Sequence, residues 1–187
     1  MATMAPTGSG PLNGVRILDL TTVVMGPLAT RALADMGADV IRVESPSGDF
    51  MRDFEPKRSP NMSAFSMNVN RNKRSLAVDL KSDAGRQILT RLLAGADAMI
   101  HNMRVRAIER LGFGYQAACA IKPDLVYAYS VGYGQAGPYK DYPAFDDLIQ
   151  GYSGLAHANQ DVQGRPKLVP MVVTDTVAGQ MLAQSVV

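Results

Sequence analysis

The sequence predicts an α/β domain built on a mostly parallel β-sheet. Short apolar segments typical of buried strands alternate with segments whose apolar residues recur at helical spacing. The first strand, helix and strand fall within residues 15–44, which is the pattern of a parallel βαβ unit with a right-handed crossover. With 187 residues, 47% of them hydrophobic and 19% charged, the chain is long enough to bury a substantial core.

The βαβ unit opens the domain and a long irregular segment follows it. Residues 15–20 form a short apolar run of the buried-strand type, and residues 29–36 have helical spacing before Gly37, which is suited to ending a helix. Residues 38–44 are expected to form the second strand. Prolines and polar residues fill residues 45–74, so we predict a loop there, of a length that is usually functional.

Strands and helices alternate again after residue 74. Ser82 is a natural N-cap for the first helix of this part, and Gly95 is a natural stop. The predicted strands are residues 76–80, 97–102, 125–131 and 168–173. The predicted helices are residues 83–94, 107–111, 115–122, 145–152 and a final helix that opens at Asp175.

Both ends of the chain carry information about its organisation. Residues 1–13 have no charged or apolar region of a signal peptide, so we expect a disordered leader. Residues 14–187 are then the N-terminal part of a large domain. The helical pattern of residues 176–187 stops without a glycine or a basic last turn, so we expect the chain to be truncated and a small domain to be missing.

Composition narrows the range of partners. The single cysteine, Cys119, cannot form an internal disulfide, which suits a cytoplasmic protein. The formal charge of +2 gives no reason to expect nucleic acid, and no apolar run approaches the roughly 18 residues that span a bilayer. His101 and His157 stand far apart and away from cysteine, so we expect no metal site and a satisfied, buried His101.

A glycine motif suggests a dinucleotide fold but lacks its context. Gly132, Gly134 and Gly137 spell G-x-G-x-x-G directly after a predicted strand. In a dinucleotide-binding fingerprint the third glycine lies inside an opening helix, whose N-terminus holds the pyrophosphate. Pro138 and Pro143 follow here, so the pattern favours a plain glycine-rich loop.

Charged residues provide three candidate sites. The basic segment 70–74, with Lys81 beyond it, is either a phosphate site beside the ends of parallel strands or a solvated loop, and it lacks the aromatic residues of a single-strand binder. Asp146 and Asp147 begin a predicted helix, where carboxylates are favoured. Asp175 lies at a strand-to-helix junction and is either a helix cap or a reactive carboxylate.

A series of motifs, weak singly but specific in this order, resembles the class III coenzyme A-transferase (CaiB/BaiF, formyl-CoA transferase-like) family. The matching segments are residues 14–20, 26–27, 33–44, 70–81, 109–113, 132–138, 145–154 and 174–179. The resemblance implies a Rossmann-like large domain from an interlocked-ring homodimer. It also implies an acyl-CoA:carboxylate CoA-transferase, with coenzyme A as a substrate, a carboxylic acid as the other substrate and no permanently bound cofactor.

The same resemblance implies the roles of individual residues. The family's nucleophile matches Asp175, which would form mixed anhydrides and an aspartyl-CoA thioester. Phe145 and Asp146 match the substrate pocket, although several family members have tyrosine in place of Phe145. Some members have a mobile glutamine at the position of Val24. The residues that match coenzyme A contacts are Val23, Val24, Met25, Val78, Lys81, Asn102, Met103, Arg110 and Leu111.

Three alternatives remain open from the sequence. α-Methylacyl-CoA racemases have a similar fold and exchange an α-proton with a histidine and an aspartate, but Phe145 stands where their histidine precedes Asp146. An intramolecular CoA-transferase would use the same chemistry within one dicarboxylate. The chain could also be an inactive coenzyme A-binding fragment.

Overall fold

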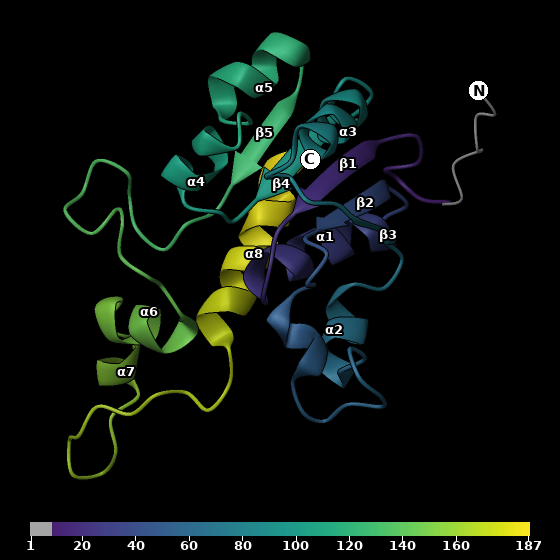
Figure 1. Ribbon diagram of the computed structural model, residues 1–187. Helices are drawn as coiled ribbons and strands as arrows, with labels where there is room; N and C mark the ends of the chain where they lie inside the picture. Colours follow the sequence, from purple (N-terminus) through teal and green to yellow (C-terminus); the bar gives the residue numbers. More distant parts are fainter. Residues whose placement is uncertain (1–8) are drawn as a thin grey trace.

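Five parallel strands form one sheet in the order β3-β2-β1-β4-β5 (Figure 1). The protein is described by a computed structural model over residues 9–187. Ile17 in the central strand pairs with Val40 on one side and Ala98 on the other. The predicted α/β fold with a mostly parallel sheet is therefore confirmed. The strands are β1 (Arg16–Leu20), β2 (Asp39–Glu44), β3 (Arg74–Ala77), β4 (Ala98–His101) and β5 (Val126–Tyr129).

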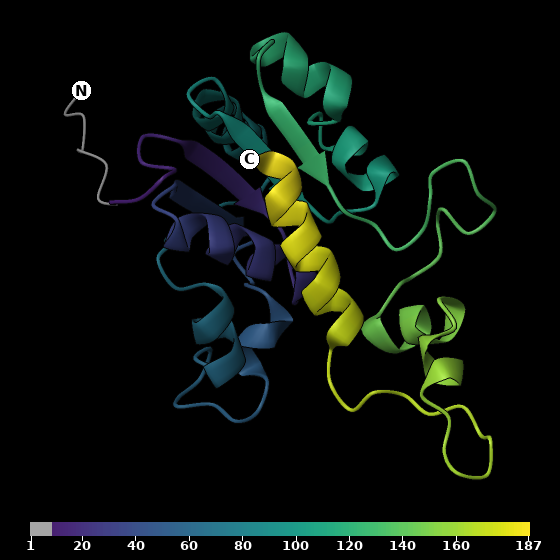
Figure 2. The same ribbon diagram turned by 180° about the vertical axis from the view of Figure 1, so that it is seen from behind.

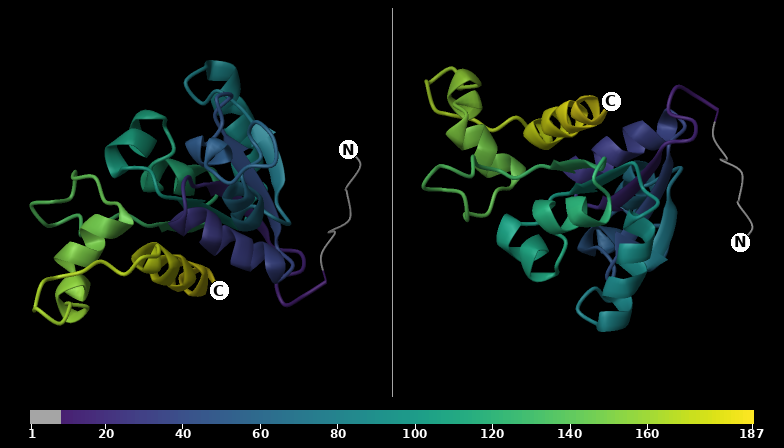
Figure 3. Two further views of the ribbon diagram at one scale, coloured as in Figure 1. Left: turned by 90° about the horizontal axis from the view of Figure 1, so that it is seen from below. Right: turned by 90° about the horizontal axis from the view of Figure 1, so that it is seen from above.

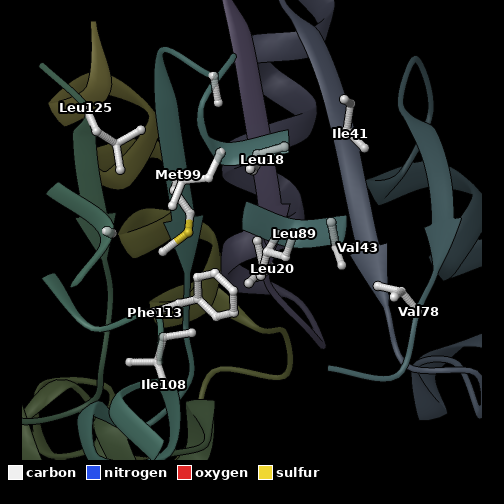
Figure 4. Close-up of a cluster of buried hydrophobic side chains, with 13 residues drawn as sticks. Leu18, Leu20, Ile41, Val43, Val78, Leu89, Met99, Ile108, Phe113 and Leu125 are labelled. Carbon is white, nitrogen blue, oxygen red and sulfur yellow. The ribbon is translucent and has the colours of Figure 1, made fainter. Parts of the chain in front are cut away.

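Helices cover both faces of the sheet, because successive side chains of a strand point to opposite faces and β1 buries Ile17 on one face and Leu18 and Leu20 on the other (Figures 2 and 3). Ile17 packs with buried residues of α1 (Met25–Asp35) and α8 (Val173–Val186). Leu18 and Leu20 point to the other face, where Leu89, Ile108 and Phe113 close the core (Figure 4). The helices of that face are α3 (Asp83–Leu93), α4 (Val105–Arg110) and α5 (Tyr115–Ile121).

The packing of α8 against α1 depends on a glycine. Gly179 is buried in α8, and a Cβ atom at this position would lie 2.6 Å from the backbone oxygen of Met25. Such a distance is shorter than any real contact, so only glycine lets the two helix backbones approach this closely.

The prediction of an irregular loop over residues 45–74 was wrong in part. This segment contains a short 3-10 helix, η1 (Phe50–Asp53), and the helix α2 (Ala64–Val69). Ser63 caps α2, since its hydroxyl accepts a 2.9 Å hydrogen bond from the Ser66 N–H. The strand predicted at residues 76–80 is observed two residues earlier, as β3, where Leu76 pairs with Val43.

The strand predicted at residues 168–173 was wrong. Residues 168–172 form an irregular connection that bends at residues 170 and 171, and Leu168 and Met171 are exposed. The side chain of Gln150 takes the place of a neighbouring strand: it accepts from the Val169 N–H at 2.8 Å and donates to the carbonyls of Val169 and Met171. The segment is apolar without alternation, and it has a proline at position 170, which has no N–H for a ladder.

The remaining predicted helices are present, with shifted ends. The final helix α8 begins at Val173, and the helix predicted at residues 145–152 is α6 (Asp146–Tyr152). A further short helix, α7 (Leu155–Ala158), was not predicted. Figure 1 shows α6 and α7 set apart from the sheet, at the far end of a long connection.

The predicted leader, residues 1–13, lies outside the described residues as far as residue 8. Of its remainder, Leu12 donates a backbone hydrogen bond of 3.0 Å to Met36 and packs against the core. Among the helices of residues 9–187, none has the length and apolarity required to cross a bilayer.

Candidate functional site

A pocket of ≈ 240 Å³ opens at the carboxyl ends of β1, β2, β3 and β4. Ligands of open α/β sheets bind at this edge, where the chain order of the strands reverses. Residues 43–45, 48–49 and 78–81 form much of the wall. Four of the coenzyme A contacts expected from the sequence line this pocket together: Val78, Lys81, Met103 and Leu111.

The turn between β1 and α1, residues 21–24, lies at this edge of the sheet, and its Thr22 lines the pocket. The side-chain amide of Asn102 holds the backbone of Thr22 on both sides, accepting from its N–H at 2.9 Å and donating to its carbonyl at 2.8 Å. Val23 has a positive φ of 69°, and its N–H donates to the Asp49 carboxylate at 2.8 Å. Val24 is 6% exposed, so its side chain belongs to the core.

A second, more polar pocket of ≈ 220 Å³ lies beside the turn. Met25, Asn102 and Phe145, all expected at the site, line it. Arg104 and Lys140 add two cationic side chains that the sequence did not single out. Both residues lie outside the segments that match the family, so no motif pointed to them as site residues. The pocket thus offers positive charge next to an exposed aromatic ring.

Arg110 lies apart from both pockets. It lines a shallow surface hollow with Arg106 and Glu109, and its Nε donates to the Arg106 carbonyl at 3.2 Å. The next residue, Leu111, does line the first pocket, so the role of Arg110 in binding coenzyme A stays a prediction.

Asp146 caps α8 from another helix. The residue before α8, Val172, has no side chain that could cap it. The Asp146 carboxylate instead accepts hydrogen bonds from the N–H groups of Thr174 and Asp175, at 2.7 and 3.0 Å, and from the Thr174 hydroxyl at 2.7 Å. Although burial raises its pKa, the hydrogen bonds from Gln150 and from the start of α8 hold the pKa of Asp146 below its usual value.

Asp175 occupies the first turn of α8 beside this carboxylate. Burial raises the pKa of Asp175 to about 6, and the negative charge of Asp146 adds to the effect. A carboxylate with a strongly raised pKa is a stronger base than an ordinary one, and such groups concentrate at functional sites. Of the two interpretations of Asp175 from the sequence, the cap is wrong for this residue, because Asp146 caps α8 instead.

The basic segment 70–74 does not form the phosphate site that we considered for it. Lys73 is buried and pairs with Asp19 at 2.9 Å, while Arg71 and Arg74 pair with surface aspartates. Among the basic residues considered for the phosphate site, Lys81 lines the first pocket.

A buried charge network lies next to the sheet edge and was missed by the sequence reasoning. Arg42 is 2% exposed and donates to Glu44 at 2.8 Å and to Asp49 at 2.9 Å. Arg52 also pairs with Glu44. The charged residues within the otherwise apolar strand of residues 38–44 were the available signal, since buried charges require partners.

His101 is buried as expected, at the end of β4. Its Nε2 lies 2.9 Å from the Tyr127 hydroxyl, and burial lowers its pKa to about 4, so the ring is neutral at physiological pH. Its Nδ1 has no partner in the part of the chain that the structure describes, so the prediction of a fully satisfied histidine was wrong for this atom. No cluster of three metal-ligating side chains occurs within residues 9–187.

Comparison with known proteins gives a consistent result. The family model described as CoA-transferase family III matches residues 12–187. The chain is 36% identical over 181 residues to a succinate–glutarate CoA-transferase of Agrobacterium fabrum, covering 93% of this chain and 45% of that protein. It is 39% identical over 170 residues to the succinyl-CoA:glutarate CoA-transferase of Mus musculus, covering 90% of this chain and 39% of the relative.

Solved structures agree with the sequence relatives. A CAIB/BAIF family protein from Brucella suis superposes with a TM-score of 0.87 at 32% identity, over 95% of this chain and 49% of that one. The protein Rv3272 from Mycobacterium tuberculosis superposes with a TM-score of 0.88 at 33% identity, over 96% of this chain and 50% of that one. The chain therefore spans about half the length of these relatives. Given the family match over nearly its whole length, this chain belongs to CoA-transferase family III, the CaiB/BaiF family.

Proposed function

We propose that the protein containing this chain is an acyl-CoA:carboxylate CoA-transferase in which Asp175 is the nucleophile. The observation that carries the proposal is the environment of Asp175: a half-buried carboxylate with a pKa of about 6, placed by a second carboxylate that is fully occupied as a helix cap. The names of the family relatives, which include transferases for succinate, glutarate and oxalate, support the same reaction class.

The proposed reaction begins with attack by an Asp175 carboxylate oxygen on the thioester carbonyl of an acyl-CoA. The C–S bond breaks, coenzyme A leaves as a thiolate, and a mixed anhydride forms. The thiolate then attacks the aspartyl carbonyl, which releases the donor acid as a carboxylate and leaves an aspartyl-CoA thioester. A carboxylate is required as nucleophile because an anhydride keeps the acyl group as activated as it was in the thioester.

The second half of the reaction reverses these steps with a new acid. The acceptor carboxylate attacks the aspartyl thioester, the thiolate leaves again, and a second anhydride forms. Thiolate attack on the acceptor's carbonyl gives the product acyl-CoA and restores the Asp175 carboxylate. Water must be excluded from both anhydrides. Since half of the length of the relatives lies outside this chain, we infer that the rest of the protein closes the site.

The expected coenzyme A contacts suggest how the substrate would lie. The apolar side chains of Val78, Met103 and Leu111 suit an adenine ring, and Lys81 at the rim suits a phosphate. The turn at residues 21–24 and Met25 lie between that pocket and α8, where the thioester would reach Asp175.

We further infer that the acceptor is a short dicarboxylic acid. Arg104 and Lys140 provide positive charge in the second pocket, which the Met25 and Phe145 side chains also line. One carboxylate would react at Asp175 while the other binds these cations. The relatives named for succinate, glutarate and oxalate act on acids of this class.

A transfer assay on the full-length protein tests the reaction class. Succinyl-CoA is incubated with glutarate, oxalate or the monocarboxylate butyrate, and new acyl-CoA is separated by chromatography. We expect transfer to the dicarboxylates, its loss in Asp175→Asn and its retention in Asp147→Asn, a matched change of the exposed aspartate next to the cap. Exchange of α-protons in D₂O without transfer would instead favour the racemase reaction.

A further inference from the structure

The turn between β1 and α1 is held in a conformation that its sequence disfavours. Val23 has φ of 69°, in the left-handed region, and it is a β-branched residue. Such residues adopt this region rarely, and it persists only where the surrounding structure imposes it. Glycine would adopt this conformation without strain, but residue 23 is a valine.

The carboxylate of Asp49 contacts this turn from a buried position. Its Oδ2 atom accepts hydrogen bonds from the Val23 N–H at 2.8 Å and from Arg42 Nη2 at 2.9 Å, and its Oδ1 atom accepts from the Met51 N–H at 3.0 Å. Asp49 is 7% exposed and Arg42 is 2% exposed. These three hydrogen bonds to the Asp49 carboxylate come from N–H donors, and only a carboxylate can accept them on both oxygens.

The turn connects the two parts of the candidate site. Thr22 and Asp49 line the first pocket, and Met25, directly after the turn, lines the second. The Met25 carbonyl packs against Gly179, which lies one helical turn after Asp175 in α8. A shift of the turn would therefore change the distance between the first pocket and the helix that carries the nucleophile.

We propose that Asp49 is a positioning residue for the reaction. It holds the Val23 backbone in its strained conformation, and the turn held in this way aligns a thioester that is bound in the first pocket with Asp175. The inference rests on the proposed function for its kinetic consequence, but the hold of Asp49 on Val23 is a separate structural statement. Asp49 reacts with nothing itself and acts through the turn.

Three variants of the full-length enzyme test this role. Asp49→Asn places an amide N–H₂ against one of the donors and so weakens the hold on Val23. Val23→Gly allows the left-handed conformation without strain, because glycine adopts it freely. The double variant combines them. Arg52→Met is the matched control: Arg52 pairs with Glu44 in the same charge network but makes no hydrogen bond to the turn.

We expect Asp49→Asn to lower kcat about tenfold, with a smaller change in KM for the acyl-CoA, because a misaligned thioester still binds. The double variant should recover at least about threefold of this loss, since its turn no longer depends on Asp49. Arg52→Met should keep kcat within about twofold. An unchanged kcat in Asp49→Asn, no recovery in the double variant or an equal loss in Arg52→Met would overturn the proposal.

Crystal structures of the variants separate this inference from the proposed function. In Asp49→Asn the φ of Val23 should leave the left-handed region, and in the double variant residue 23 should return to it. If the wild-type protein transfers no coenzyme A, the proposed function fails while these structures still decide whether Asp49 holds the turn. A Val23 φ that stays positive in Asp49→Asn would refute the hold itself.

Discussion

At the scale of single residues, the site depends on two aspartates that differ in their surroundings. Asp146 has its charge stabilised by donors from α6 and α8, while Asp175 is desolvated and lies close to that charge. Environment alone separates the two carboxyl groups, because their side chains are chemically identical. In the proposed mechanism the nucleophile is the group with the raised pKa, Asp175.

The acid limb of the pH profile reports on this pair. Asp175 must be ionised to attack, so kcat/KM should fall as the pH drops through about 6. Asp146→Asn removes the neighbouring charge and should move this limb to lower pH, while burial keeps it above the ordinary value for aspartate. Asp147→Asn, an exposed neighbour, should leave the limb in place. An identical limb in all three proteins would contradict the coupling.

The same pKa predicts a change in stability. Because the pKa of Asp175 is higher in the folded protein than the usual 3.8, its charged form destabilises the fold above pH about 6. Asp175→Asn should therefore raise the free energy of unfolding by about 1–2 kcal/mol at neutral pH, a figure reduced for partial solvent screening. The gain should vanish below pH about 4, where the aspartate is protonated in both states. Urea titrations at the two pH values measure it.

At the scale of elements, hydrophobic periodicity predicted the helices and strands that bury their own apolar face. It failed where the conformation of a segment depends on contacts with residues distant in the sequence. The βαβ unit was predictable because each of its elements buries its own apolar face, such as Ile17 and Leu33. The wrong strand at residues 168–173 has apolar residues that this chain leaves exposed, and its backbone is bound by Gln150, 19 residues away. No local sequence pattern predicts a hydrogen bond between a side chain and a backbone so far apart in the chain.

In the candidate site, too, the residues could be suggested from the sequence but their distant contacts could not. The ordered family motifs suggested Asp175, Val78 and Lys81, and the structure brings Val78 and Lys81 together in one pocket. The capping role of Asp146 spans 28 residues, and the contact of Asp49 with Val23 spans 26. Each depends on the tertiary fold, so the residue types suggested possible roles but not the partners.

The contact between α1 and α8 is an element-scale feature that can be tested. Gly179→Ala should force the helices apart, because the new Cβ would lie 2.6 Å from the Met25 carbonyl oxygen, and should lower the free energy of unfolding by roughly 2 kcal/mol. Gly151→Ala is the control: it also lies in a helix, but nothing surrounds its Cβ position within 4 Å. That change should be neutral or stabilise by up to about 1 kcal/mol. Equal effects in thermal unfolding would argue against the close approach.

At the scale of the whole molecule, α8 has too much exposed apolar surface for a solvated helix. Val177 and Met181 of α8 are 53% and 62% exposed, while Leu182 and Ala183 of the same helix are buried. Val177 and Met181 are four residues apart and so lie on one face of the helix, and an exposed apolar stripe of this kind is normally covered. Since the relatives are about twice as long, we propose that the rest of the protein covers α8 within an interlocked homodimer.

A charged residue on this face tests the covering. In the full-length protein, Met181→Glu should lower the free energy of unfolding by about 2–3 kcal/mol, because the new carboxylate would be buried without a partner. Gln163→Glu adds the same charge in an exposed loop and should change the stability by less than about 0.5 kcal/mol. Light scattering should give the same oligomeric state for both variants as for the wild type under native conditions. An unchanged stability of Met181→Glu would mean that α8 stays exposed.

Trapping with hydroxylamine tests the central claim, that Asp175 carries coenzyme A, most directly. The full-length enzyme is incubated with an acyl-CoA and hydroxylamine, digested, and analysed by peptide mass spectrometry. The activated aspartyl group should be converted to a hydroxamate at Asp175 and not at Asp146 or Asp147, and only when the acyl-CoA is present. Label at another residue, or normal turnover by Asp175→Ala, would contradict the account.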